Sequence, residues 1–122
     1  MRAFVLSIFV SLSLAGLLGA GEMGITGLVI DQTRSRVGQE FYENFYRKWM
    51  SLPASFRDGY NIVVGEFYNP KYGFVLSVKV DGTLVYQSFT MPRSEEIEER
   101  AKEAIGAVID YIIGVQNGRE KR

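Results

Sequence analysis

The chain has 122 residues, with 14 Lys and Arg against 14 Asp and Glu, and it contains neither His nor Cys. This length suits one domain. Without His and Cys there is no imidazole base, no thiol nucleophile, and no thiolate or imidazole ligand for zinc. Disulfides are excluded as well. A neutral chain without a dense basic stretch is a poor match for nucleic acid, because that affinity depends on neutralising phosphates.

The N-terminal segment has the pattern of a secretory signal peptide. A basic residue, Arg2, precedes an uncharged apolar run over residues 3–18, and small residues follow at 19–21. We expect residues 1–21 to be cleaved, with the exact cleavage position open, and residues 22–122 to form a single domain. The alternative is a membrane anchor, but this apolar run of 16 residues is shorter than the roughly 20 that span a bilayer.

The expected domain begins with a short apolar segment at residues 27–30, either a strand or an arm. Residues 34–50 predict an amphipathic helix, because large apolar side chains recur in steps of four: Val37, Phe41, Phe45 and Trp49. A side-chain oxygen of Asp31 or Thr33 is expected to cap this helix. A proline then prevents its continuation, and residues 53–59 predict a loop.

The middle of the chain changes to a period of two. Residues 60–67, 74–80 and 83–90 predict three antiparallel strands, because β-branched and aromatic residues alternate with polar ones. Turn residues separate the first two strands at 69–73. Asp81-Gly82 is a strong signal for a tight hairpin between the last two.

The length of that turn decides which side chains of the last strand share a face with Phe74, Leu76 and Val78. A two-residue turn pairs Val80 with Thr83 and puts one alternating set there: Val85, Gln87 and Phe89. A three-residue loop puts the other set there: Leu84, Tyr86 and Ser88. We favour the two-residue turn. Either register leaves an aromatic side chain, Tyr86 or Phe89, on the solvent side of the sheet.

A second long helix follows Pro92, with Ser94 expected as its cap and Asn117-Gly118 as its end. Glu95 and Glu96 carry the favourable sign for its first turn. Its core stripe is formed by seven residues: Ile97, Ala101, Ala104, Ile105, Val108, Ile112 and Val115. The fold class is therefore α+β. We expect a two-layer domain of helix, three-stranded antiparallel sheet and helix, with both helices on one face of the sheet.

Two groups of residues could carry function. Acidic residues gather at the start of the second long helix and could bind a cation or act as an acid–base pair: Glu95, Glu96, Glu98, Glu99 and Glu103. A solvated, capped helix end explains them better. The aromatic residues outside the expected core are the stronger signal, because large rigid side chains on a surface often mark contacts with other proteins.

The ordered set of residues resembles the CsgE-type family of curli secretion accessory factors. The first part of the match has the pattern G-L-x4-T-x4-G-x2-F-Y-x2-F-x2-K-W: Gly27-Leu28, Thr33, Gly38, Phe41-Tyr42, Phe45 and Lys48-Trp49. The second part follows through the strands: Asn61, Glu66, Gly73, Val78, Val80, Tyr86-Gln87-Ser88-Phe89 and Pro92. The resemblance covers nearly all of the chain after the expected signal peptide.

The resemblance implies a periplasmic α+β protein. We expect no catalytic activity and no cofactor, because the chain lacks His and Cys. Such a protein holds curlin subunits unfolded and delivers them to an outer-membrane secretion channel, which it caps as a ring-shaped homo-oligomer. Five aromatic residues are the candidates for protein contacts: Trp49, Tyr86, Phe89, Tyr68 and Tyr72. The first two match aromatic positions of the family. Compared with the family, the loop at residues 52–59 looks longer than usual and the chain after Gly118 looks shorter.

Two other functions stay open on the residues alone. One is a periplasmic small-ligand-binding module, which predicts a monomer with a concave apolar site on the sheet face. The other is an envelope hydrolase working through two convergent carboxylates, although the acidic residues of this chain have the spacing of a solvated helix face.

Overall fold

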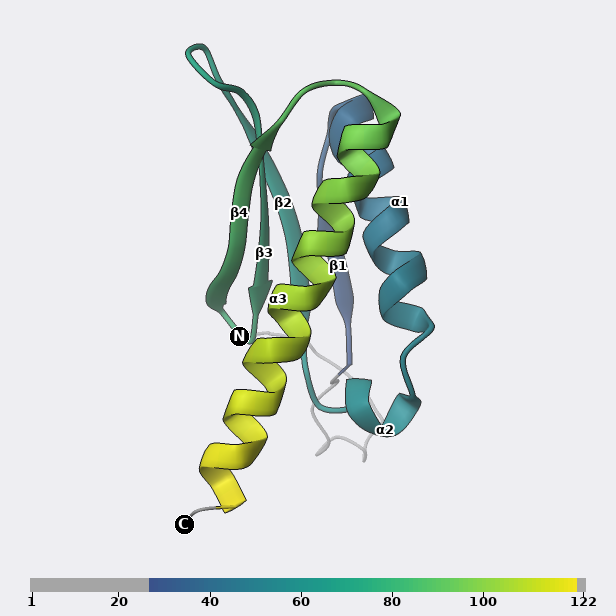
Figure 1. Ribbon diagram of the computed structural model, residues 1–122, viewed down its shortest axis with the longest axis vertical. Coiled ribbons are helices and arrows are strands. Elements are labelled where there is room, and N and C mark those ends of the chain that lie inside the picture. Colours follow the sequence, from purple (N-terminus) through teal and green to yellow (C-terminus); the bar gives the residue numbers. More distant parts are fainter. Residues whose placement is uncertain (1–26, 121–122) are drawn as a thin grey trace, which may run out of the picture.

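The computed structural model describes residues 27–120, so the signal peptide expected at 1–21 lies outside the described residues. Seven elements follow in chain order: β1 (Val29–Gln32), α1 (Arg36–Met50), α2 (Ala54–Arg57), β2 (Ile62–Asn69), β3 (Gly73–Val80), β4 (Thr83–Thr90) and α3 (Ser94–Glu120). Figure 1 shows α1 and α3 side by side on one side of the sheet. The α+β class and the two-layer arrangement are confirmed.

The sheet has four strands, not the three expected. Its order is β1-β2-β3-β4, with β1 parallel to β2 and the other pairs antiparallel. The segment considered as a strand or an arm is thus an edge strand. A parallel neighbour needs a crossover connection, and α1 supplies it. Two hydrogen bonds secure the start of this pairing: Leu28 N donates to Asn61 Oδ1 (3.1 Å), and Ile62 N donates to Leu28 O (2.8 Å).

Helix α1 begins at Arg36, two residues later than expected from the sequence. Ser35, and not Asp31 or Thr33, is its N-cap, with its Oγ accepting a hydrogen bond from Gly38 N at 2.9 Å. Asp31 instead accepts one from Thr33 N at 2.8 Å, within the chain leading to the helix. The expected stripe is confirmed, because all four of its apolar residues are buried: Val37, Phe41, Phe45 and Trp49.

Glu66 of β2 ties the sheet to the start of α1. Its Oε1 accepts hydrogen bonds from Arg34 N (2.7 Å) and Ser35 N (3.0 Å), two backbone groups next to the helix start. The carboxylate lies directly over Gly38, where a Cβ atom would overlap with Glu66 Oε1. Gly38 and Glu66, far apart in the sequence, therefore form one contact, and this contact needs a residue without a side chain in α1.

Three local expectations were wrong. The loop at residues 53–59 contains the short helix α2. Arg93 O is the first carbonyl to accept a helical hydrogen bond, from Ile97 N at 2.9 Å, so Arg93 and not Ser94 occupies the N-cap position of α3. Asn117-Gly118 does not end α3, which continues to Glu120; its glycine has open space around it.

The core lies between the sheet and the two long helices. The sheet contributes its inward row of apolar residues, all fully buried: Ile62, Val64, Leu76, Val78 and Val80. Helix α3 covers this row with small and branched residues: Ile97, Ala101, Ala104, Val108 and Ile112. Small residues such as Ala101 and Ala104 allow α3 to approach the sheet and α1 closely.

The hairpin between β3 and β4 has the two-residue turn that we favoured, with Val80 paired to Thr83 and positive φ angles at Asp81 and Gly82. The face expected from this turn was nevertheless wrong. A bulge at Val78/Lys79 shifts the register by one, so that Val78 pairs with Tyr86. A one-residue shift moves every later side chain to the opposite face. Tyr86 therefore faces the helices and Phe89 faces away.

Candidate protein-interaction surface

The β2–β3 hairpin extends beyond the end of the helical layer, and Figure 1 shows its teal tip clear of α3. The turn is held locally: Asn69 Oδ1 accepts hydrogen bonds from Lys71 N (2.8 Å) and Tyr72 N (3.1 Å). Gly73 follows with φ of +88°, a backbone conformation that favours glycine. The turn expected at residues 69–73 is thus confirmed, and it positions a rigid projection rather than a loose loop.

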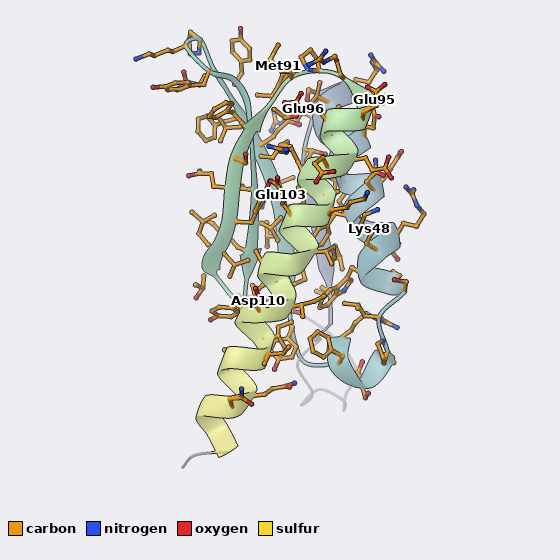
Figure 2. The ribbon with its side chains drawn as sticks, viewed as in Figure 1. Lys48, Met91, Glu95, Glu96, Glu103 and Asp110 are labelled. Carbon is orange, nitrogen blue, oxygen red and sulfur yellow. The ribbon has the colours of Figure 1, made fainter. Side chains whose placement is uncertain are left out.

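Five large apolar side chains are exposed around this projection: Phe67 (51%), Tyr68 (62%), Tyr72 (52%), Phe89 (57%) and Met91 (54%). We call this set the hairpin patch. It combines the distal ends of β2 and β4 with the turn between β2 and β3. Figure 2 shows Met91 at the same end of the molecule as the hairpin tip. Such a concentration of exposed apolar groups is typical of a surface that contacts another molecule.

Part of the hairpin patch is a row across the outer sheet face. Phe67 pairs with Val75, and Val75 pairs with Phe89. No described helix covers this face, yet Val75 is only 9% exposed. The two flanking rings shield it. Tyr72 extends the row by stacking on Phe89, with ring centroids 5.7 Å apart and planes at 23°. The rings are therefore preorganised and would lose little side-chain entropy on binding.

The reverse side of the hairpin is aromatic too. Tyr68 and Phe74 make an edge-to-face contact with centroids 5.4 Å apart. Charges of both signs border the hairpin patch: Lys71 Nζ lies 5.3 Å from the centre of the Tyr72 ring, and Met91 N donates a hydrogen bond to Glu96 Oε2 at 3.5 Å. No acidic residue occurs between Phe67 and Met91 except Asp81, which lies at the opposite hairpin. The aromatic surface itself is uncharged, and this chemistry suits a largely neutral stretch of polypeptide.

Three of the five sequence candidates, Tyr68, Tyr72 and Phe89, belong to the hairpin patch. Phe67 and Met91 were missed as candidates. The alternation of β2 could have identified Phe67, since residues two apart share a face. Met91 carries no periodic signal, because it follows the last strand.

Trp49 lies elsewhere. It is 1% exposed and belongs to the core cluster under the sheet. A side chain in this position cannot contact a partner directly, so the structure gives no support to Trp49 as a contact residue. We took its place at the end of α1 as a sign of a contact surface, but the last turn of this helix still packs into the core.

Tyr86 is also not on the solvent face, because the bulge turns it towards α3. Its ring stacks on Phe41, with centroids 6.4 Å apart and planes at 13°. Its hydroxyl donates a hydrogen bond to Glu103 Oε1 at 2.8 Å, and Figure 2 shows Glu103 on α3. Burial, and then the hydrogen bond to Glu103, raises the pKa of Tyr86 from 10.0 to about 12. Through its hydrogen bond to Glu103, Tyr86 connects β4 to α3.

The raised pKa of Tyr86 predicts a stability change at alkaline pH. The folded pKa exceeds the unfolded one, so the stabilisation by neutral Tyr86 is complete below pH 10 and is lost as the pH rises to about 12. Tyr86→Phe should cost about 1 kcal/mol below pH 10, and this difference should shrink towards pH 12. Urea unfolding of both proteins across this window measures it. A constant difference throughout would contradict the shift.

Other concave sites are shallow and lie on the helices. One groove runs between α2 and α3 and is lined by Leu52, Pro53, Ser55, Phe56, Ile109 and Gln116. Another lies along α1 beside Tyr42, Tyr46 and Met50. Neither is on the sheet face where a ligand-binding module was expected to have its pocket. Over residues 27–120, no His, Cys, Asp or Glu side chains group in a way that could hold a metal ion.

The acidic residues of α3 behave as a helix surface. Glu96 pairs with Arg93 at 3.4 Å and Glu103 with Arg100 at 3.1 Å. Within the described part of the chain, no helix is long and apolar enough to cross a membrane.

Comparison with known proteins gives one consistent result. The model of the family described as "Curli assembly protein CsgE" matches residues 25–121. Two proteins named "Curli production assembly/transport component CsgE", from Escherichia coli O6:H1 and Escherichia coli O157:H7, are each 30% identical over 85 residues, covering 70% of this chain and 62% of their own length. The Salmonella typhi protein of the same name is 28% identical over 78 residues, covering 64% of this chain and 56% of that protein.

The matched segment thus spans somewhat less than two thirds of these relatives. The family match, in contrast, includes every described helix and strand. It contains the Gly38–Glu66 contact, the hairpin patch and both long helices. The chain belongs to the curli assembly protein CsgE family.

Proposed function

We propose that this chain is an exported accessory factor of curli secretion. In this proposal the signal peptide at residues 1–21 directs it to the periplasm, where it binds unfolded curlin subunits. It delivers them to the outer-membrane secretion channel and caps the periplasmic side of that channel as a homo-oligomeric ring. It needs no cofactor and catalyses no reaction.

The observation that carries the proposal is the hairpin patch on a member of a curli assembly family. Its aromatic rings are exposed on a rigid hairpin and preorganised by stacking. Flat aromatic surfaces can make many weak contacts with an unfolded chain without requiring one fixed conformation of that chain. We assign Tyr68, Tyr72 and Phe89 to such protein contacts, together with Phe67 and Met91.

A double variant of the hairpin patch tests this proposal. Tyr72→Ser/Phe89→Ser removes two stacked, exposed rings. Phe89 also shields Val75, so we expect a small loss of stability with the fold retained. Two aromatic contacts of about 1 kcal/mol or more each predict a loss of curlin affinity of roughly tenfold or greater. The measurement is curlin binding by the purified protein, followed by curlin secretion in a bacterium lacking its own accessory factor.

The matched control changes exposed apolar residues outside the hairpin patch. Tyr46 is 40% and Ile113 is 43% exposed, so Tyr46→Ser/Ile113→Ser removes similar surface from the helices. This control should bind and secrete curlin as the wild type does. If the patch variant is folded and fully active, the hairpin patch is not the contact surface.

Light scattering coupled to size exclusion tests the capping role. The proposal predicts a discrete large oligomer, either by itself or in the presence of the channel. If the protein stays monomeric at high concentration and does not bind the channel, the capping role is wrong and the small-ligand-binding module is favoured instead.

A further inference from the structure

The free edge of the sheet at β4 is a second feature that the hairpin patch does not explain. Strand β4 is the last in the sheet order, and Figure 1 shows it at the left border of the sheet with no described element beyond it. Among the described strands it pairs with β3 alone. Between residues 27 and 120, no backbone group of Thr83–Thr90 bonds to another element on the outer side. An eight-residue edge is therefore open.

The composition of this edge is unusual for an exposed strand. Residues 83–90 read TLVYQSFT and contain no charged residue and no proline. Proteins commonly protect their sheet edges with charges, proline, bulges or very short strands. The bulge lies near the start of β4, opposite Val78/Lys79, so the segment from Tyr86 to Thr90 pairs with β3 in regular register. That segment keeps a regular, neutral edge.

The opposite edge is protected in the expected way. Strand β1 has only four residues, Val29–Gln32, and includes the exposed acidic residue Asp31. The chain leaves the sheet directly after it, where Asp31 accepts a hydrogen bond from Thr33 N at 2.8 Å. Within one sheet, one edge is short and charged while the other is long and neutral. The difference indicates that β4 is kept available for pairing.

We infer that the edge of β4 binds an extended, uncharged segment of a partner polypeptide as an added strand. Main-chain hydrogen bonds would supply affinity without requiring one sequence. Charged side chains are disfavoured in the added segment, because β4 has no charge of opposite sign to pair with them. Side chains of that segment would lie beside Gln87 and Phe89 on the outer face, next to the hairpin patch. Under the proposed function, on which this inference rests, the segment belongs to unfolded curlin.

A second copy of this chain fits the free edge of β4 less well than an unfolded partner does. It could offer β1, which is short and acidic, or its own β4. Pairing β4 with β4 around a two-fold axis closes a dimer and uses up both edges. Such a dimer does not extend to the ring of the proposed function. An unfolded chain has no such restriction, since any extended neutral stretch can pair along the whole of β4.

Amide hydrogen exchange, followed by NMR on the purified protein, tests this inference directly. Unfolded curlin, diluted from denaturant, should slow exchange at least tenfold at the β4 amides that point away from β3. The amides of β1 should not change. Gln87→Lys places a charge on the exposed face of β4 and should weaken curlin binding about tenfold. Gln32→Lys places the same charge on β1, also at an exposed position, and should leave the affinity unchanged.

The outcomes separate this inference from the proposed function. If curlin binds the wild type but β4 gains no protection and Gln87→Lys binds normally, strand addition is wrong and the proposed function stands. If curlin does not bind the wild type at all, both are wrong. If β4 becomes protected without curlin as the protein concentration rises, and Gln87→Lys dissociates an oligomer, the edge pairs with another copy and the inference is overturned.

Discussion

Trp49→Ala should destabilise the domain by about 3–5 kcal/mol, which is the usual cost of truncating a buried aromatic side chain to Ala. Trp49 is among the largest fully buried residues, and it belongs to the same core cluster as Phe45 of α1. A domain of this size has a total stability of roughly 5–15 kcal/mol. The change should therefore lower the melting temperature by at least about 12 °C and leave a sizeable unfolded fraction under mild stress.

Urea unfolding followed by circular dichroism measures this effect, because Trp49 is the single Trp of the chain and its fluorescence is lost in the variant. Tyr46→Ala, on the exposed side of the same helix, is the matched control and should cost less than about 1 kcal/mol. If the Trp49→Ala protein keeps wild-type stability but no longer binds its partners, Trp49 is a contact residue after all. Otherwise a loss of assembly in this variant reports unfolding, and the Tyr72 and Phe89 variants are the proper test of binding.

The sequence predicted α1, α3 and the β3–β4 hairpin because each has a strong local signal. The four-residue steps of α1 identified its buried face, and Asp81-Gly82 identified the turn. These signals depend only on neighbours within a few residues. Trp49 belongs to the same stripe, but we expected it to be a contact residue because it ends the helix and matches an aromatic position of the family; it is 1% exposed and lies in the core.

The features that could not be predicted depend on contacts between distant segments. Strand β1 has four residues and pairs with β2 more than 30 residues later in the chain, and nothing in its own sequence indicates a parallel partner. Nothing in the local sequence indicates the bulge at Val78/Lys79 either. This bulge nevertheless turns Tyr86 towards α3 and Phe89 towards solvent. The turn was therefore predicted correctly, but the side chains of β4 after the bulge were assigned to the wrong face. The full hairpin patch could be identified only from the structure.

The pairing of Gly38 with Glu66 is another distant contact, and it predicts a large effect from a small substitution. A Cβ atom at position 38 would overlap with Glu66 Oε1 and lie 2.8 Å from Thr33 Cβ. Gly38→Ala should therefore displace the carboxylate from the backbone N–H groups of Arg34 and Ser35. Loss of these hydrogen bonds and the overlap outweigh the gain of about 1 kcal/mol that Ala brings to a helix interior. We expect a net loss of about 2 kcal/mol, or roughly 10 °C in melting temperature.

A double-mutant cycle with Glu66→Ala identifies the cause. Once the carboxylate is absent, Gly38→Ala should cost much less, because only the close approach to Thr33 remains. Gly106→Ala in α3, where the added Cβ meets nothing within 4 Å, is the matched control and should stabilise the protein by about 0.5–1 kcal/mol. Additive costs at positions 38 and 66 would show that the two residues act separately. A strong coupling would show that Gly38 in the first turns of α1 and Glu66 in β2 act as one contact, which fixes how the first helix joins the sheet.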